Sequence, residues 1–209
     1  MNTTVTQDEA IKIAGGLFPK IARVIQAAFQ HFVDIKKQKT AVIPNLLFEP
    51  RTAYGNVHDF IKAGIRNEFG NEPNVRIAEP NGIFVMIVEE KIVLRFKKMN
   101  KDFQTSNVQT AQTDDYNNQD LQSLFPGQLT FLHVGYLPDL TCTYVENIYL
   151  FCRSGKNIEW HHSLKGSMRQ LSIEMEAQVL QVEATEPRVS IKKSLNHSLK
   201  TGTDDEPGV

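Results

Sequence analysis

The chain has 209 residues, of which 41% are hydrophobic and 22% are charged, and its formal net charge is -1. This ordinary globular composition excludes a global electrostatic attraction to nucleic acid or to an anionic membrane. Any binding of that kind must come from a local patch of charge.

The first seventy residues predict three helices. Thr6 and Glu9 form a capping-box pattern at the start of a short first helix. Pro19 fits the first turn of a second helix, where its missing N–H costs little. Asn56 is the expected cap of the third. Apolar residues recur at helical spacing in the second helix and should cover one face of a sheet; they are Ile21, Val24, Ile25, Phe29 and Phe32.

From Asn74 the sequence predicts strands, because short segments rich in β-branched and aromatic residues alternate with turn residues. Between the third and fourth segments, "TDDYNNQDLQSLFPG" begins with a Thr cap at Thr113 and predicts a short crossing helix. The last two strands should form a hairpin around residues 154–157. The expected strands are "NVRIA", "GIFVMIV", "KIVLRFKK", "LTFLHVGY", "ENIYLFCR" and "NIEWHHSL".

These elements predict an α+β fold, with N-terminal helices packed on a mainly antiparallel sheet of five or six strands. A single domain is expected over residues 1–185, helical over 6–70 and mainly β over 74–164. The segment 166–183 satisfies both a strand and a helix pattern, and propensity favours the helix. Residues 186–209 are polar, which predicts a disordered C-terminal tail.

Residues 87–99, "IVEEKIVLRFKKM", contain the E-x-K spacing of metal-dependent nucleases at Glu89 and Lys91. Glu79 or Asp59 could supply the upstream carboxylate. However, the charged triplet separates two apolar runs, as a hairpin turn with its charges at the solvent tip does. We therefore favour the turn and no catalytic residues, and we keep Glu79, Glu89 and Lys91 as the alternative, a nuclease site.

The strand after this turn is the candidate binding surface. Alternation places its basic side chains on a half-exposed face, where they could contact phosphates or an acidic partner. The competing interpretation is a solvated edge strand, in which lysines discourage edge-to-edge aggregation. The candidate binding residues are Lys91, Arg95, Lys97, Lys98 and Lys101.

The remaining chemical motifs are weak. Cys142 and Cys152 lie in apolar, strand-like surroundings and are expected to be reduced core residues. His161 and His162 are adjacent on a predicted strand, so they point to opposite faces and do not chelate one ion. We expect no metal site and no cofactor.

The N-terminal sequence "MNTTVTQDEA" lacks the basic start and apolar run of a signal peptide. No apolar stretch is long enough to cross a bilayer. We therefore expect a cytoplasmic protein with no membrane partner.

The segment "LFPGQLTFLHVGYLPDL", residues 124–140, is taken together with Gln119 upstream and Trp160 downstream. In this spacing the chain resembles poorly characterised small bacterial proteins of toxin–antitoxin-like or phage-defence modules, over roughly residues 83–164. The resemblance contains no catalytic motif, and it implies a partner-dependent intracellular protein.

We therefore expect a binding or regulatory protein with a protein partner. The alternatives are a nucleic-acid-directed toxin or nuclease, and a non-catalytic nucleic-acid binder. The oligomeric state stays open.

Overall fold

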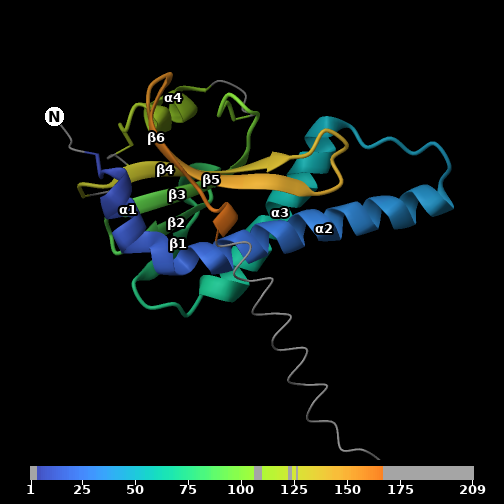
Figure 1. Cartoon of the computed structure of the whole chain (residues 1–209), viewed down its shortest axis with the longest axis horizontal. Helices are drawn as coiled ribbons and strands as arrows, with labels where there is room; N and C mark the ends of the chain where they lie inside the picture. Colours follow the sequence, from blue (N-terminus) through green and yellow to red (C-terminus); the bar gives the residue numbers. More distant parts are fainter. Residues whose placement is uncertain (1–3, 106–109, 122–123, 126, 167–209) are drawn as a thin grey trace, which may run out of the picture. The chain divides into compact units, whose positions relative to one another are not determined.

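A computed structural model describes residues 4–105, 110–121, 124–125 and 127–166 of the chain. Six strands form one sheet in the order of the sequence (Figure 1). The pair β3–β4 is parallel and the other neighbouring pairs are antiparallel. The predicted α+β class with a mainly antiparallel sheet is confirmed. The strands are β1 (Val75–Ala78), β2 (Val85–Val88), β3 (Ile92–Lys98), β4 (Thr130–Pro138), β5 (Val145–Ser154) and β6 (Asn157–Ser163).

The two faces of the sheet carry separate apolar cores. The larger core joins one face to the N-terminal helices, and the smaller core joins the opposite face to α4 and the segment that follows it. The helix α4 belongs to the crossover that makes β3 and β4 parallel, as antiparallel neighbours need no such connection. The helices are α1 (Gln7–Ala14), α2 (Phe18–Val42), α3 (Pro50–Phe69) and α4 (Ala111–Asn117), with 3₁₀ turns η1 (Gly15–Leu17) and η2 (Pro80–Gly82).

The helical layer forms largely as its sequence predicts. Thr6 and Glu9 make the expected capping box at α1. The whole apolar stripe of α2 is buried in the larger core, and its Phe29 ring packs edge-on against Tyr136 of β4. The predicted start of the third helix at Asn56 is wrong. The helix α3 begins at Pro50, because proline is pre-organised for a first helical turn.

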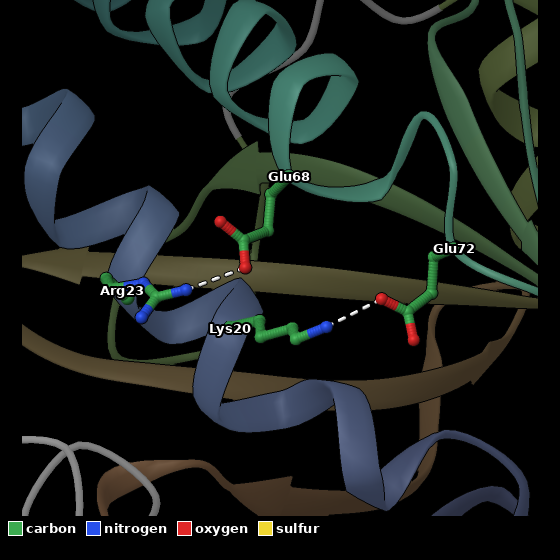
Figure 2. Close-up of polar contacts among 4 residues, drawn as sticks. All are labelled: Lys20, Arg23, Glu68 and Glu72. Carbon is green, nitrogen blue, oxygen red and sulfur yellow. Dashed lines mark hydrogen bonds and ion pairs between the residues drawn. The ribbon is translucent and has the colours of Figure 1, made fainter. Parts of the chain in front are cut away.

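Helices α2 and α3 pack closely at Gly64, where an added Cβ would lie 2.7 Å from Cγ1 of Val24. Two ion pairs also join α2 to α3 and to the turn after it: Arg23–Glu68 and Lys20–Glu72, each 2.6 Å long (Figure 2). Because these ion pairs are partly exposed, they contribute little stability. The close apolar packing therefore holds the two helices together.

On the opposite face, polar side chains near α4 bond to the sheet backbone. The Tyr116 hydroxyl lies 2.7 Å from the carbonyl oxygen of Leu132 and is fully buried. The Gln119 amide donates to the carbonyl oxygens of Phe131 and Arg153 and accepts from the Phe131 N–H. These bonds fix α4 over the middle of the sheet. The cap of α4 is Thr110, three residues before the predicted cap.

Both predicted hairpin turns are confirmed. Glu89 and Glu90 form the turn between β2 and β3 with φ angles of 52° and 49°, and the Lys91 N–H donates to the Val88 carbonyl oxygen. Gly155, with φ 61°, lies in the turn between β5 and β6. The expectations for 166–183 and for the tail concern residues outside the described part, apart from Gly166 itself.

Among the described residues, no helix combines the length and apolar character that crossing a bilayer requires.

Candidate functional site

The structure does not bring the two glutamates of the nuclease alternative together. Glu79 follows the last residue of β1, whereas Glu89 follows the last residue of β2, so they lie at opposite ends of an antiparallel pair. The Glu89 N–H donates to the carbonyl oxygen of Asn74. Five residues of nearly extended chain separate Asn74 from Glu79, which places the two glutamates about 16 Å apart along the sheet.

Each nuclease candidate also has an ion-pair partner. Glu79 bonds to Lys62 and Arg66 of α3, and the Lys62 hydrogen bond is the main reason why the pKa of this carboxyl lies below its usual value. Glu89 pairs with Lys91 at 3.1 Å. In the described part of the chain, no group of three or more His, Cys, Asp or Glu is placed to hold a metal ion.

The basic candidates of β3 do not share one surface. Lys91 lies in the turn, Lys101 is exposed in the segment after β3, and Lys98 lies on the helical side with its Nζ 3.4 Å from the centre of the Tyr54 ring. The alternative of a solvated edge strand is wrong, since β3 pairs with β2 and with β4. Only Arg95 and Lys97 remain on the face that also carries α4.

Arg95 is buried rather than half-exposed as predicted. Its side chain is only 9% exposed, because the guanidinium lies 5.2 Å from the centre of the Tyr116 ring of α4. Its Nη1 has no hydrogen-bond partner among the described residues. Burial lowers the pKa of this guanidinium. The alternation of side chains along β3 therefore predicted the correct face for Arg95. It did not predict the burial of Arg95, because that burial depends on α4, which lies farther along the sequence.

His133 of β4 lies directly opposite Arg95 and is fully buried. Its Nε2 is 3.0 Å from Oδ1 of Asn117, and its ring stacks on Phe151 of β5 at 5.0 Å. No residue in the described ranges forms a hydrogen bond with its Nδ1. Burial, followed by repulsion from Arg95, Arg153 and other cations, holds the pKa of His133 well below its usual value. The imidazole is therefore neutral.

Two further cations complete this region. Burial, followed by repulsion from Arg95, lowers the pKa of Lys97 to about 8. The Nε of Arg153 is buried and forms no hydrogen bond with any residue that the structure describes. No ion pair joins Arg95, Lys97 or Arg153 to a described acidic residue. Sequence analysis missed His133 and Arg153, because each is isolated in its own strand and only the sheet register places them near Arg95.

The two adjacent histidines point to opposite faces, as predicted. The ring of His162 lies 5.9 Å from that of Phe18 on the helical side, and the ring of His161 lies 4.7 Å from that of Phe103. Both cysteines are free, and Cys152 is in the core. Cys142 is half-buried in the β4–β5 loop with φ 54°, so the prediction of a strand position was wrong for it.

A second region of interest is the end of α2 that extends beyond the sheet (Figure 1). Val33 is the last buried residue of the helix. The nine residues that follow continue α2 for about 13 Å with few contacts to the core. Most of their side chains are exposed, including Lys36, Lys37 and Lys39.

Exposed apolar groups gather at this end. In the described part of the chain, the large hydrophobic side chains that are exposed lie in two segments, 42–47 and 140–144. Leu47 is 87% exposed and Leu140 is 95% exposed. We call this region the tip surface; it consists of Lys36, Lys37, Val42, Ile43, Leu47, Leu140 and Tyr144.

A groove of about 450 Å³ lies between the end of α2 and the β4–β5 loop; it is lined by Val33, Lys36, Lys37, Thr40 and Ala41 of α2 and by Cys142 and Thr143 of the loop. The loop is shaped by Asp139, whose carboxylate accepts from the N–H groups of Thr141, Thr143 and Tyr144. The Tyr54 hydroxyl lies 3.0 Å from Sγ of Cys142 and ties the loop to α3.

No family model, curated protein or solved structure matches this chain. The resemblance to toxin–antitoxin and phage-defence proteins therefore stays a prediction from the sequence.

Proposed function

We propose that the chain is a binding protein that acts together with a protein partner, and that the tip surface is its contact area. The observation that carries the proposal is the exposure of Val42, Ile43, Leu47, Leu140 and Tyr144 in two segments that flank the groove between α2 and the β4–β5 loop. Contiguous exposed apolar patches mark interaction sites in soluble proteins, whereas single exposed apolar residues are ordinary.

The chemistry of the tip surface favours an acidic, partly apolar segment of another protein. Leucine and tyrosine supply apolar anchors, and Lys36 and Lys37 line the adjacent groove. Residues 34–51 carry four cations and two acids, so the surroundings are net positive. Such a rim attracts an acidic partner and excludes a basic one, while the apolar centre supplies most of the affinity.

The proposal moves the expected contact away from the basic strand. Arg95 is too deeply buried for a broad protein contact, and Lys91 is paired with Glu89. A role in a bacterial toxin–antitoxin or phage-defence module is part of the proposal and rests on the sequence resemblance alone. The nuclease alternative loses support, because Glu79 and Glu89 lie at opposite ends of β1 and β2.

The proposal is tested by placing a photo-reactive amino acid at Leu47 or at Leu140 in the full-length chain within cells. The control position is Glu159, which is exposed on β6. We expect both tip positions to cross-link the same protein and the control position to miss it. Different products from Leu47 and Leu140, or the same product from Glu159, would contradict the proposal.

The identified partner is then purified and its affinity measured by calorimetry. The double variant Leu47→Asp/Leu140→Asp should weaken binding by at least about tenfold, since central apolar anchors dominate interface energy. The control Gln128→Glu/Asn157→Asp adds the same charge at exposed positions outside the tip and should leave the affinity unchanged. Binding to nucleic acid that falls steeply with salt would instead favour the nucleic-acid alternative.

A further inference from the structure

The sheet face under α4 contains three cations around one neutral histidine. Sheet register places Arg95 of β3 beside His133 of β4, and His133 beside Phe151 of β5. Lys97 is two residues beyond Arg95 on β3, beside Gly135 of β4. Arg153 is two residues beyond Phe151 on β5, just past the residues paired with β4, and it is close enough to His133 to contribute to the lowering of its pKa. We call Arg95, Lys97, Arg153 and His133 the cation cluster.

Folding alone does not account for the cation cluster. A buried charge is costly unless it is paired and hydrogen-bonded. Within the part of the chain that the structure describes, Nη1 of Arg95, Nε of Arg153 and Nδ1 of His133 have no hydrogen-bond partners. Burial is the main cause of the lowered pKa of Lys97, and repulsion from Arg95 adds to it. Each buried polar atom without a partner requires an explanation, and an ion or ligand at these atoms is one.

We propose that the cation cluster binds the phosphate group of a small molecule. This site is separate from the tip surface and does not depend on the function proposed for it. The guanidinium group is planar and presents a fork of donors that matches phosphate oxygens. Two such groups flanking one histidine therefore supply the charge and the directed N–H groups that a phosphate needs.

Each member of the cluster has a distinct role in this proposal. Nη1 of Arg95 and Nε of Arg153 donate to phosphate oxygens, and Lys97 contributes charge. Because Oδ1 of Asn117 accepts from His133, the proton of the imidazole is on Nε2, and Nδ1 is an acceptor. That nitrogen accepts from a protonated phosphate oxygen. Asn117 is thus a positioning residue for His133.

The burial of Arg95 limits the size of the ligand. A guanidinium on a side chain only 9% exposed is out of reach of the continuous backbone of a nucleic-acid duplex. The proposed ligand is therefore small: a free phosphate, or the terminal phosphate of a small molecule. The half-exposed rings of Phe103 and Tyr149, packed together at 5.1 Å, border the same face and offer an aromatic edge to a nucleotide base.

The test is calorimetric titration of the full-length chain with inorganic phosphate and with adenosine monophosphate, against sodium chloride at matched ionic strength. We expect saturable binding of at least one phosphate compound and none of chloride. Tighter binding of the monophosphate would identify a nucleotide-type ligand, and equal binding would identify phosphate alone. Heats that match those of sodium chloride would overturn the proposal.

Variants separate a ligand-binding role from a structural one. Arg95→Met should weaken phosphate binding by about 10- to 100-fold, which corresponds to loss of one charged hydrogen bond. In the absence of phosphate, its unfolding temperature should be unchanged or raised, because a buried charge without a partner is removed. The control Arg76→Met removes an exposed arginine that pairs with Glu90 and should not change the affinity.

A lowered unfolding temperature of Arg95→Met with unchanged phosphate affinity would contradict the role of Arg95. Lys97→Met should also weaken phosphate binding, and full affinity in this variant would contradict the proposed cation cluster. The second variant keeps the test informative if Arg95→Met fails to fold. The tip variant Leu47→Asp/Leu140→Asp should bind phosphate normally. Failure of the protein-partner proposal and failure of the phosphate proposal are therefore distinguishable.

Discussion

The tip surface and the cation cluster depart from the usual distribution of residues in opposite ways. At the tip surface, large apolar side chains such as Leu47 and Leu140 are in water. In the cation cluster, charged groups such as Arg95 are buried without a described acidic partner. The first arrangement leaves apolar area for a macromolecular partner to cover, and the second leaves hydrogen-bond donors for a small anion to satisfy.

Within α2 and within β3, one segment contributes to the stability of the fold and the next segment contributes little. The part of α2 before Val33 is embedded in the larger core, whereas the part after it is almost free of core contacts. Likewise, β3 is apolar and buried at Ile92–Leu94, whereas the next residue, Arg95, is a cation whose Nη1 has no hydrogen-bond partner among the described residues. One element thus contains a structural segment and a segment whose chemistry suits binding.

The largest expected effect is a difference in the free energy of unfolding between a variant in the buried part of α2 and a variant just beyond its exposed end. Phe29→Ala should lower the free energy of unfolding by about 3–5 kcal/mol, because the ring is only 2% exposed and packs on Tyr136. Leu47→Ala, just beyond the same helix, should change it by less than about 0.5 kcal/mol. Urea unfolding of both variants measures the contrast. Equal losses would mean that the tip surface is part of the core.

A smaller effect is expected from Lys97, whose pKa is about 8 in the folded chain against an ordinary value of 10.5. The folded state disfavours the protonated form of Lys97. Protonated Lys97 therefore destabilises the folded chain below pH 8, and this destabilisation disappears as the pH rises from about 8 to about 10.5. Below pH 8, Lys97→Met should be more stable than wild type by on the order of 1 kcal/mol, allowing for partial exposure. Urea unfolding from pH 7 to pH 10.5 should show the difference shrinking; a constant difference would contradict the assigned pKa.

The smallest effect is expected in the β4–β5 loop. Desolvation raises the pKa of Asp139, but hydrogen bonds from Thr141, Tyr144 and Thr143 outweigh it and lower the pKa below the ordinary value of 3.8. The carboxylate therefore stabilises the loop above pH 3.8, and this contribution is lost as the pH falls below that value. At neutral pH, Asp139→Asn should speed amide exchange over residues 140–144, with little change in Tm. Unchanged exchange would show that the loop holds its shape without this carboxylate.

Local patterns were sufficient for much of the fold. The alternation of apolar runs with "EEK" predicted the turn at Glu89 and Glu90, and the helical stripe from Ile21 to Phe32 predicted the buried face of α2. These features depend on neighbours in the sequence. The start of α3 was misplaced because Asn56 is a good cap residue by type, although Pro50 begins the helix in the structure.

The candidate sites depended on contacts between distant segments. Alternation placed Arg95 on the correct face of β3, but its burial requires Tyr116, twenty-one residues later in the sequence. His133 and Arg153 joined it only through sheet register. Leu47 and Leu140 look like ordinary core residues by type, and their exposure follows from how far α2 and the β4–β5 loop extend.

The most direct test of the account is one set of urea unfolding curves for the isolated chain at pH 7. It compares wild type, Leu47→Asp/Leu140→Asp and Arg95→Met. If both regions serve binding rather than folding, neither variant should lose more than about 1 kcal/mol, since Leu47 and Leu140 are exposed and Arg95 makes no ion pair with another described residue. A loss of about 3 kcal/mol or more in either variant would assign that region to the stability of the fold and contradict the account.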